Sequence, residues 1–229
     1  KDIKLNYSST DEVGTIAKSF NEAINIINNQ SKSKDLFMRN MMHELKTPIT
    51  KAMFIAETLE DEKTRLNLQK AFKRMDDIIK ELATVEKLTS KNTMIYKEEN
   101  TFLNIYNRTL EIMLVNANNI EAQITDFNFK VDNSMMPIAL KNLIDNAIKF
   151  SPNKKAIINA NENKIEIISL GEQLKHELAY YTEAFSQEEK RSDGFGLGLY
   201  IVKTIVNLHG FKLEYKYEDG KNYFIVNMK

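Results

Sequence analysis

The most informative stretch of this sequence is NLIDNAIKF, residues 142–150. It ends a longer segment, 135–150, whose apolar side chains recur at helical spacing: Leu140, Leu143, Ile144 and Ala147. Asn142, Asn146 and Lys149 follow at i, i+4 and i+7, roughly on the opposite face. Amide oxygens are hard ligands and an ammonium group neutralises phosphate, so this row suits a Mg²⁺–phosphate group. An ordinary outward polar stripe on an amphipathic helix is the alternative.

Short apolar runs and turn residues surround this helix. A second helix is predicted over 197–208. Two hairpins are predicted as well, one from 156–160 and 165–169 and one from 211–217 and 222–228. Strands separated by helices indicate a sheet covered by helices on one face.

Three of the seven glycines cluster at Gly194, Gly196 and Gly198, just before the apolar run 199–208. Backbone without side chains at a helix start can approach phosphates and direct N–H groups at them. A mobile loop is the alternative. The spacing is neither the dinucleotide fingerprint nor a P-loop, because no Gly-Lys-Ser/Thr follows.

The first 95 residues hold one glycine and one proline and are rich in helix formers. Two seams of nearly heptad spacing predict a helical hairpin with a polar turn at 61–63. The predicted seams are Met41, Leu45, Pro48, Ala52, Ala56, Leu59 and Leu68, Phe72, Met75, Ile79, Leu82, Val85. A two-helix hairpin buries too little alone, so two chains are expected to form a four-helix bundle.

His43 lies about 200° around the first helix from both Met41 and Leu45, which predicts an exposed imidazole. Thr47 follows one turn later on the same face, and Glu44 is adjacent. A solvated polar face is the alternative for a lone histidine. The other histidines, His176 and His209, fit no such pattern and are predicted to be structural or exposed.

The composition excludes several classes of protein. Lys plus Arg and Asp plus Glu number 32 each, which leaves no electrostatic footprint for nucleic acid or an anionic membrane surface. Without cysteine there are no disulfides or thiolate metal sites, which suits a reducing cytosol. No run approaches the ~18 apolar residues of a membrane span. Because the chain opens at Lys1, we expect a piece of a longer protein whose membrane anchor lies upstream.

Several motifs resemble those of sensor histidine kinases, in that family's order. The segment around His43 is similar to the family's phosphoacceptor motif, which it matches at Phe37, Asn40 and His43–Pro48. Met42 stands where a serine is common in the family. NLIDNAIKF resembles the asparagine box, Tyr181–Phe185 the phenylalanine box and Gly194–Leu199 the second glycine box. The run Asp11–Gly14, followed by Phe20-Asn21, resembles the second helix of a HAMP relay module.

The resemblance implies an α+β fold in three parts. Residues 1–30 would end a HAMP module, and 31–95 would form the dimerising phosphotransfer hairpin, a four-helix bundle in the homodimer. Residues 96–229 would form an α/β-sandwich ATP-binding domain of the type shared with gyrase and heat-shock chaperones. The chain would be the cytoplasmic portion of a cell-membrane protein.

The resemblance also implies catalytic roles. His43 would be the nucleophile that takes the γ-phosphoryl group of ATP, and Glu44 would orient the imidazole and accept its proton. Thr47 would align a water that dephosphorylates the partner. Pro48 would remove a helix hydrogen bond and can kink the bundle there.

For the nucleotide, the resemblance implies ATP with Mg²⁺. Asn146 would hold the metal ion, Asn142 and Lys149 would contact phosphates, and Phe150 would pack near the base. Residues 172–196 would be a short lid, with Lys190 or Arg191 reaching the γ-phosphate. The glycine box would contribute Gly194, Gly196, Leu197, Gly198 and Leu199.

The first glycine box departs from the family pattern. Ser169 stands where an aspartate normally accepts a hydrogen bond from the adenine amine. Gly171 keeps the first glycine, but Gln173 replaces the second.

The implied function is an ATP-dependent protein histidine kinase that passes its phosphoryl group to an aspartate of a response regulator and also dephosphorylates it. Two alternatives stay open. A degenerate ATP site would leave a regulator-binding phosphatase or scaffold. A mechanical ATPase of the same nucleotide-binding class would release phosphate without labelling itself.

Overall fold

The computed structural model describes residues 5, 11–90, 93–113, 119–186 and 195–229. The chain divides into two compact units, Lys1–Glu86 and Lys87–Lys229. No helix among these described residues is both long enough and apolar enough to cross a membrane.

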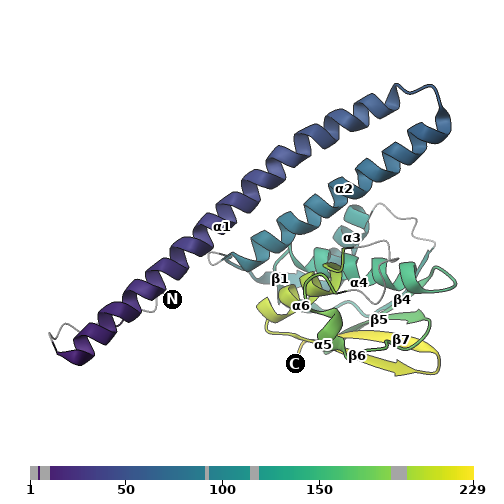
Figure 1. Cartoon of the computed structure of the whole chain (residues 1–229). Helices are drawn as coiled ribbons and strands as arrows, with labels where there is room; N and C mark the ends of the chain where they lie inside the picture. Colours follow the sequence, from purple (N-terminus) through teal and green to yellow (C-terminus); the bar gives the residue numbers. More distant parts are fainter. Residues whose placement is uncertain (1–4, 6–10, 91–92, 114–118, 187–194) are drawn as a thin grey trace. The chain divides into compact units, whose positions relative to one another are not determined.

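The first unit is built on two long helices, α1 (Glu12–Glu57) and α2 (Glu62–Thr89) (Figure 1). Asp11 caps α1, because its carboxylate accepts a 2.8 Å hydrogen bond from the Gly14 N–H. Asp61 lies in the predicted turn and accepts at 2.9 Å from the Thr64 N–H at the start of α2. The predicted helical hairpin is confirmed.

The hairpin is held by an apolar cluster of Met42, Ile49 and Ile79, against which Met53, Phe72, Leu82 and Ala83 pack. The predicted seam of α2 is confirmed at Phe72, Ile79 and Leu82, but Met75 is exposed. The predicted seam of α1 is confirmed at Ala56, which is 1% exposed, but was wrong at Met41 and Leu45. Met41 and Leu45 remain 42% and 43% exposed, because α1 carries a second apolar stripe that includes Met42 and Ile49 and packs against α2 instead.

The second unit contains a five-stranded sheet of order β2-β4-β5-β7-β6. Its strands are β2 (Ile120–Ile124), β4 (Ala156–Ala160), β5 (Lys164–Leu170), β6 (Lys212–Glu218) and β7 (Lys221–Asn227). Only β2 and β4 pair in parallel; the other neighbours are antiparallel. A separate antiparallel pair joins β1 (Glu98–Thr101) to β3 (Asn128–Val131). Both predicted hairpins are confirmed.

Three helices lie together on one side of this sheet: α3 (Phe102–Met113), α4 (Met136–Phe150) and α6 (Gly198–Leu208) (Figure 1). A short helix, α5 (Leu178–Tyr181), lies between β5 and α6 in the sequence. The core between the helices and the sheet includes Ile144, Ile165, Ile201 and Val226, which are all 0–1% exposed. The predicted sheet covered by helices is confirmed.

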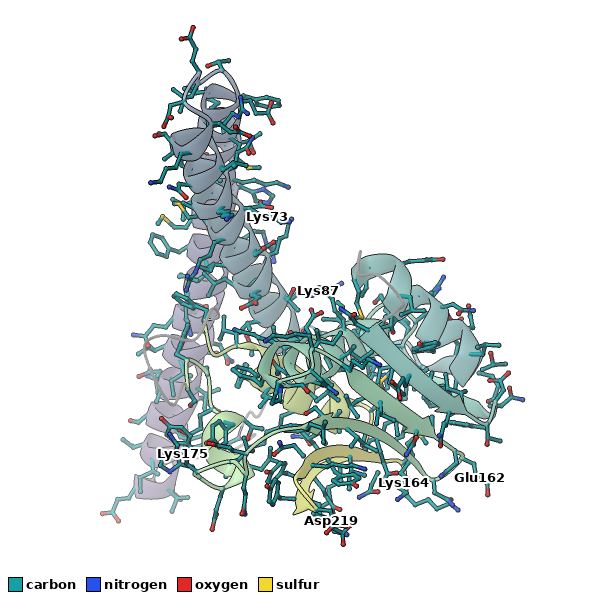
Figure 2. All side chains as sticks on the ribbon, turned by 90° about the vertical axis from the view of Figure 1, so that its right-hand side faces the viewer. Lys73, Lys87, Glu162, Lys164, Lys175 and Asp219 are labelled. Atoms are coloured by element: carbon teal, nitrogen blue, oxygen red, sulfur yellow. The ribbon has the colours of Figure 1, made fainter. Side chains whose placement is uncertain are left out.

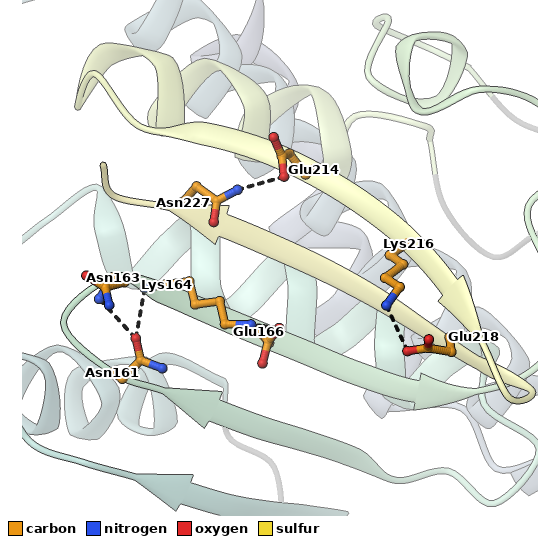
Figure 3. A network of polar contacts seen from close by, with 8 residues as sticks. All are labelled: Asn161, Asn163, Lys164, Glu166, Glu214, Lys216, Glu218 and Asn227. Carbon is orange, nitrogen blue, oxygen red and sulfur yellow. Dashed lines mark hydrogen bonds and ion pairs between the residues drawn. The ribbon is translucent and has the colours of Figure 1, made fainter.

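The opposite face of the sheet carries polar pairs (Figure 3). Lys164 pairs with Glu166 at 2.6 Å, Lys216 pairs with Glu218 at 2.8 Å, and the Asn227 amide donates to Glu214 at 2.7 Å. Figure 2 shows Glu162 and Lys164 at the β4–β5 turn and Asp219 at the β6–β7 turn. Because side chains alternate along strands, polar residues here and apolar residues on the other face specify which face the helices cover.

Candidate functional site

His43 lies in α1, and its side chain is exposed, as are those of Glu44 and Thr47. Thr47 follows His43 by four residues, so both side chains project from the same face of the helix. The preceding residue, Met42, is buried in the hairpin core. The predicted exposure of the imidazole is confirmed, although the buried stripe lies beside His43 rather than opposite it.

The backbone next to His43 is altered by Pro48, which lies inside α1. A proline has no N–H, so the carbonyl of Glu44, four residues earlier, loses the hydrogen bond it would accept in a regular helix. The Thr50 hydroxyl donates to the Lys46 carbonyl at 2.9 Å. The helix continues through this turn to Glu57.

Asn142 and Asn146 project from α4 toward the first residue of α6. The Asn142 Nδ2 donates to the Ile138 carbonyl at 2.8 Å, which leaves its Oδ1 directed at Gly198. A Cβ atom built on Gly198 would lie 3.2 Å from Asn142 Oδ1 and 3.7 Å from Asn146 Nδ2. The structure thus brings together two predicted segments that are about fifty residues apart in sequence.

The N-terminus of α6 meets this pair of amides without a side-chain cap. Leu197 occupies the capping position with its side chain fully buried, and the first turn contains no acidic residue. Leu199, in the same turn, is half-buried. Backbone N–H groups at such a helix end attract anions, so the arrangement suits phosphate oxygens.

The chain is closely packed just before α6. Gly196 has φ +73°, and its carbonyl accepts a 3.1 Å hydrogen bond from the Phe185 N–H. A Cβ atom on Gly196 would lie 2.5 Å from the Ser186 carbonyl oxygen, so only glycine fits there. The predicted site residues Arg191 and Gly194, and Lys190 with them, lie outside the described residues.

The remaining predicted nucleotide residues gather where α4 and β5 end. The Lys149 Nζ lies 5.1 Å from the centroid of the Phe150 ring, which is itself 61% exposed. Ser169 is buried near the end of β5, and Gly171 follows it. A Cβ atom on Gly171 would lie 3.8 Å from the Phe150 carbonyl oxygen. The sequence prediction overlooked Asn222, which pairs with Ser169 across the sheet. The predicted hairpins alone did not reveal this, since it depends on the register between β5 and β7.

The buried His209 is structural, as predicted. Its Nε2 accepts from the Asp132 N–H at 2.9 Å and its Nδ1 donates to the Ile205 carbonyl at 2.7 Å, which requires the neutral Nδ1–H tautomer. Burial lowers the pKa of His209. Burial alone would raise the pKa of Asp132, but hydrogen bonds from Ser134, Tyr96 and Met135 outweigh it and lower that pKa.

Two families match this chain in consecutive segments. Residues 33–91 match the His Kinase A (phospho-acceptor) domain. Residues 132–229 match the family of histidine kinase-, DNA gyrase B- and HSP90-like ATPases. This chain belongs to the sensor histidine kinases.

Two curated relatives align with nearly the whole chain. The sensor histidine kinase ArsS of Helicobacter pylori is 29% identical, covering 99% of this chain and 54% of the relative. The heme sensor protein HssS of Staphylococcus epidermidis is 26% identical, covering 95% of this chain and 52% of the relative. The chain therefore spans about half the length of these curated relatives.

Two solved structures share the fold. Full-length ShkA in complex with AMPPNP superposes with a TM-score of 0.63 at 18% identity, covering 82% of this chain and 45% of ShkA. The histidine kinase AdeS of Acinetobacter baumannii superposes with a TM-score of 0.59 at 20% identity, covering 82% of this chain and 98% of AdeS. These likenesses support the helical hairpin followed by a mixed α/β domain.

Proposed function

We propose that this histidine kinase phosphorylates its own His43 with ATP and passes the phosphoryl group to an aspartate of a response regulator. The observation that carries the proposal is the placement of the Asn142 and Asn146 amides against the uncapped N-terminus of α6. This is a site for a metal-bound triphosphate, in the same chain as an exposed histidine flanked by Glu44 and Thr47.

In the proposed reaction, a neutral ring nitrogen of His43 attacks the γ-phosphorus of ATP. A nitrogen–phosphorus bond forms, the bond from the γ-phosphorus to the bridging oxygen breaks, and ADP leaves. Glu44, adjacent to His43, would orient the ring and accept its proton. Thr47, on the same face, would position water when the phosphorylated regulator is hydrolysed.

The side chains present fit Mg²⁺ and phosphate. The Asn146 amide oxygen is a hard ligand of the kind that Mg²⁺ prefers, and Asn146 faces the start of α6. Bound Mg²⁺ would neutralise charge on the transferring phosphoryl group. Asn142, Lys149 and the N–H groups of Gly198 and Leu199 would orient the phosphates.

The hairpin is proposed to dimerise. Met41, Leu45, Phe54 and Ile55 are each more than 40% exposed on α1 outside the hairpin core. A second hairpin covering these apolar side chains would complete a four-helix bundle.

We propose three parts for this chain: the end of a HAMP module at 1–30, the phosphotransfer hairpin at 31–95 and the ATP-binding domain at 96–229. The Asn21 amide exchanges two 2.9 Å hydrogen bonds with the backbone of Leu5, which places Leu5 beside α1. Because the curated sensor kinases are about twice as long, the input region and a membrane anchor are proposed to belong to segments outside this chain.

Incubation with γ-labelled ATP tests the proposal. The expected label is acid-labile and alkali-stable, as a phosphoimidazole is, and His43→Gln should lose it. Nucleotide affinity of that variant should stay within about a factor of 3, roughly 0.65 kcal/mol. Acid-labile label on His43→Gln would refute the acceptor. Nucleotide binding without any label, but with regulator dephosphorylation, would favour the phosphatase or scaffold that Ser169 and Gln173 suggest.

A further inference from the structure

Arg39 is a basic residue one helical turn before His43. Residues four apart in a helix share a face and have Cβ atoms about 5–6 Å apart, so the two side chains are neighbours on α1. Both are exposed. Because Cα–Cβ bonds tilt toward the N-terminus of a helix, the His43 imidazole leans over the turn that contains Arg39. The other basic residue within one turn, Lys46, lies on the C-terminal side of His43.

A carboxylate of α2 holds the Arg39 side chain. The Arg39 Nη2 donates to Glu86 Oε1 at 3.3 Å, and the side chains are 57% and 11% exposed, respectively. Charge-assisted N–H···O bonds are normally about 2.7–2.9 Å long, so this contact is a long and weak one. It uses one nitrogen of a guanidinium group that carries five N–H donors. The guanidinium is thus held one turn from His43 with donors that this contact does not use.

Phosphorylation of His43 would place a stronger anion beside this guanidinium. A phosphoryl group carries close to two negative charges near neutral pH and offers three acceptor oxygens, whereas the Glu86 carboxylate carries one charge. The planar fork of an arginine matches phosphoryl oxygens with two parallel N–H···O bonds. Arg39 can therefore exchange its weak contact with Glu86 for a stronger one with the phosphorylated imidazole.

We propose that Arg39 binds the phosphoryl group on His43 and that Glu86 competes for the same guanidinium. This inference rests on the proposed function, since it concerns the phosphorylated form of the same acceptor. Arg39 stabilises the phosphohistidine, and Glu86 limits that stabilisation. Together the two residues set how readily His43 gives up its phosphoryl group.

Reversal of autophosphorylation by ADP measures this stabilisation. In the reverse reaction the bond from the ring nitrogen to phosphorus breaks, a β-phosphate oxygen of ADP forms the new bond, and the ring regains the proton accepted by Glu44. The labelled fraction of the chain at a fixed ratio of ATP to ADP gives the equilibrium constant.

Arg39→Gln removes the positive charge and should shift this equilibrium toward ATP by about three- to tenfold. The affinity for ATP, measured by calorimetry, should not change, because the proposed nucleotide residues belong to the second unit and Arg39 to the first. Arg39→Lys keeps the charge without the planar fork and should recover part of the loss.

Glu86→Gln should shift the equilibrium in the opposite direction. It removes the competing charge and keeps the size of the side chain, so the phosphohistidine should gain at least about twofold. If the pair of Arg39 and Glu86 served only to join α1 to α2, the two substitutions would weaken the hairpin alike. They would then not shift the equilibrium in opposite directions. Thermal unfolding of both variants measures the structural contribution separately.

Lys51→Gln is the matched control. Lys51 is an exposed cation on the same helix, about 12 Å along the axis from His43, so removing its charge should leave the equilibrium unchanged. Raising the salt concentration from about 50 mM to about 500 mM should reduce the difference between Arg39→Gln and the unaltered chain, because exposed charges are screened.

The outcomes are distinct. An equilibrium that Arg39→Gln leaves unchanged, or that Arg39→Gln and Glu86→Gln shift in the same direction, overturns the proposal while autophosphorylation stands. An equal shift by Lys51→Gln also overturns it, since the overall charge of α1 would then explain the effect. If Arg39→Gln does not fold, Glu86→Gln decides, and an unchanged or lowered labelled fraction in that variant overturns the proposal. Absence of label from the unaltered chain would refute the proposed function itself.

Discussion

Gly198 lies so close to Asn142 that a Cβ atom on the glycine would be 3.2 Å from the asparagine Oδ1. The contact joins α4 to the uncapped start of α6, and Asn146 lies on the same side at 3.7 Å. The proposed metal and phosphate ligands therefore come from two helices whose approach depends on a residue without a side chain.

Asn146→Ala is predicted to abolish kinase activity while the domain stays folded, because the side chain is only half-buried and faces α6. Loss of a metal ligand should reduce the autophosphorylation rate at least about 100-fold. Asn207→Ala, an exposed asparagine on α6, is the matched control and should be normal. A normal rate in Asn146→Ala would exclude the metal role.

Thr47→Ala is predicted to keep autophosphorylation and to slow dephosphorylation of the phosphorylated regulator at least about tenfold. The hydroxyl can position water, whereas forming a phosphoimidazole needs no hydroxyl. Thr50→Ala is the control, because the Thr50 hydroxyl already donates a hydrogen bond to the Lys46 carbonyl of its own helix. If Thr47→Ala lost both activities equally, the residue would have a structural role instead.

Ser169→Asp is predicted to tighten ATP binding about five- to tenfold and to sharpen selectivity against GTP. A carboxylate accepting from the adenine amine contributes about 1.5–3 kcal/mol, against about 0.5–1.5 kcal/mol for a neutral hydroxyl. The neighbouring Asn222 Nδ2 can donate to the new carboxylate and limit the cost of burying it. Calorimetry decides, and unchanged or weaker ATP binding would mean that Ser169 does not occupy the adenine position.

Gly196→Ala is predicted to destabilise the ATP-binding domain and to weaken ATP binding at least about tenfold. The alanine would have to adopt a positive φ, and its Cβ would lie 2.5 Å from the Ser186 carbonyl oxygen, so the backbone must move. Gly210→Ala is the control, because Gly210 has φ +78° but no atom within 4 Å of a built Cβ. It should cost only about 1–2 kcal/mol in thermal unfolding and leave ATP binding intact. Equal effects of the two substitutions on binding would contradict the steric argument.

His209 is predicted to make the ATP-binding domain less stable in acid. Its folded pKa is lowered by burial from the ordinary value of 6.5, so below that pH the unfolded chain binds a proton that the folded chain does not. The stabilisation is therefore present above 6.5 and is lost as the pH falls toward the folded pKa. Thermal unfolding from about pH 8 to about pH 5 should show this slope, and His209→Gln should flatten it. An imidazole that titrates at or above 6.5 in the folded protein by NMR would contradict the prediction.

Local signals in the sequence specify the order and type of the elements that carry the proposed site. The spacing of Leu140, Leu143 and Ile144 specified a helix face, and Asp219-Gly220 specified a hairpin, because both signals are local. The exposure of His43 was predicted for the same reason. The presence of Ser169 where the family normally has an aspartate was also visible in the sequence.

Which surfaces meet depends on the packing of elements that are distant in the sequence. Helix α1 carries two apolar stripes of similar periodicity, which lie about 100° apart around the helix. One stripe contains Met41 and the other contains Met42, and it is the stripe with Met42 that packs against α2. The pairing of Ser169 with Asn222 depends on strand register between segments about fifty residues apart, which no local pattern contains. The approach of Gly198 to Asn142 likewise follows from packing α6 on α4, because a glycine's missing side chain has meaning only when its neighbour is known.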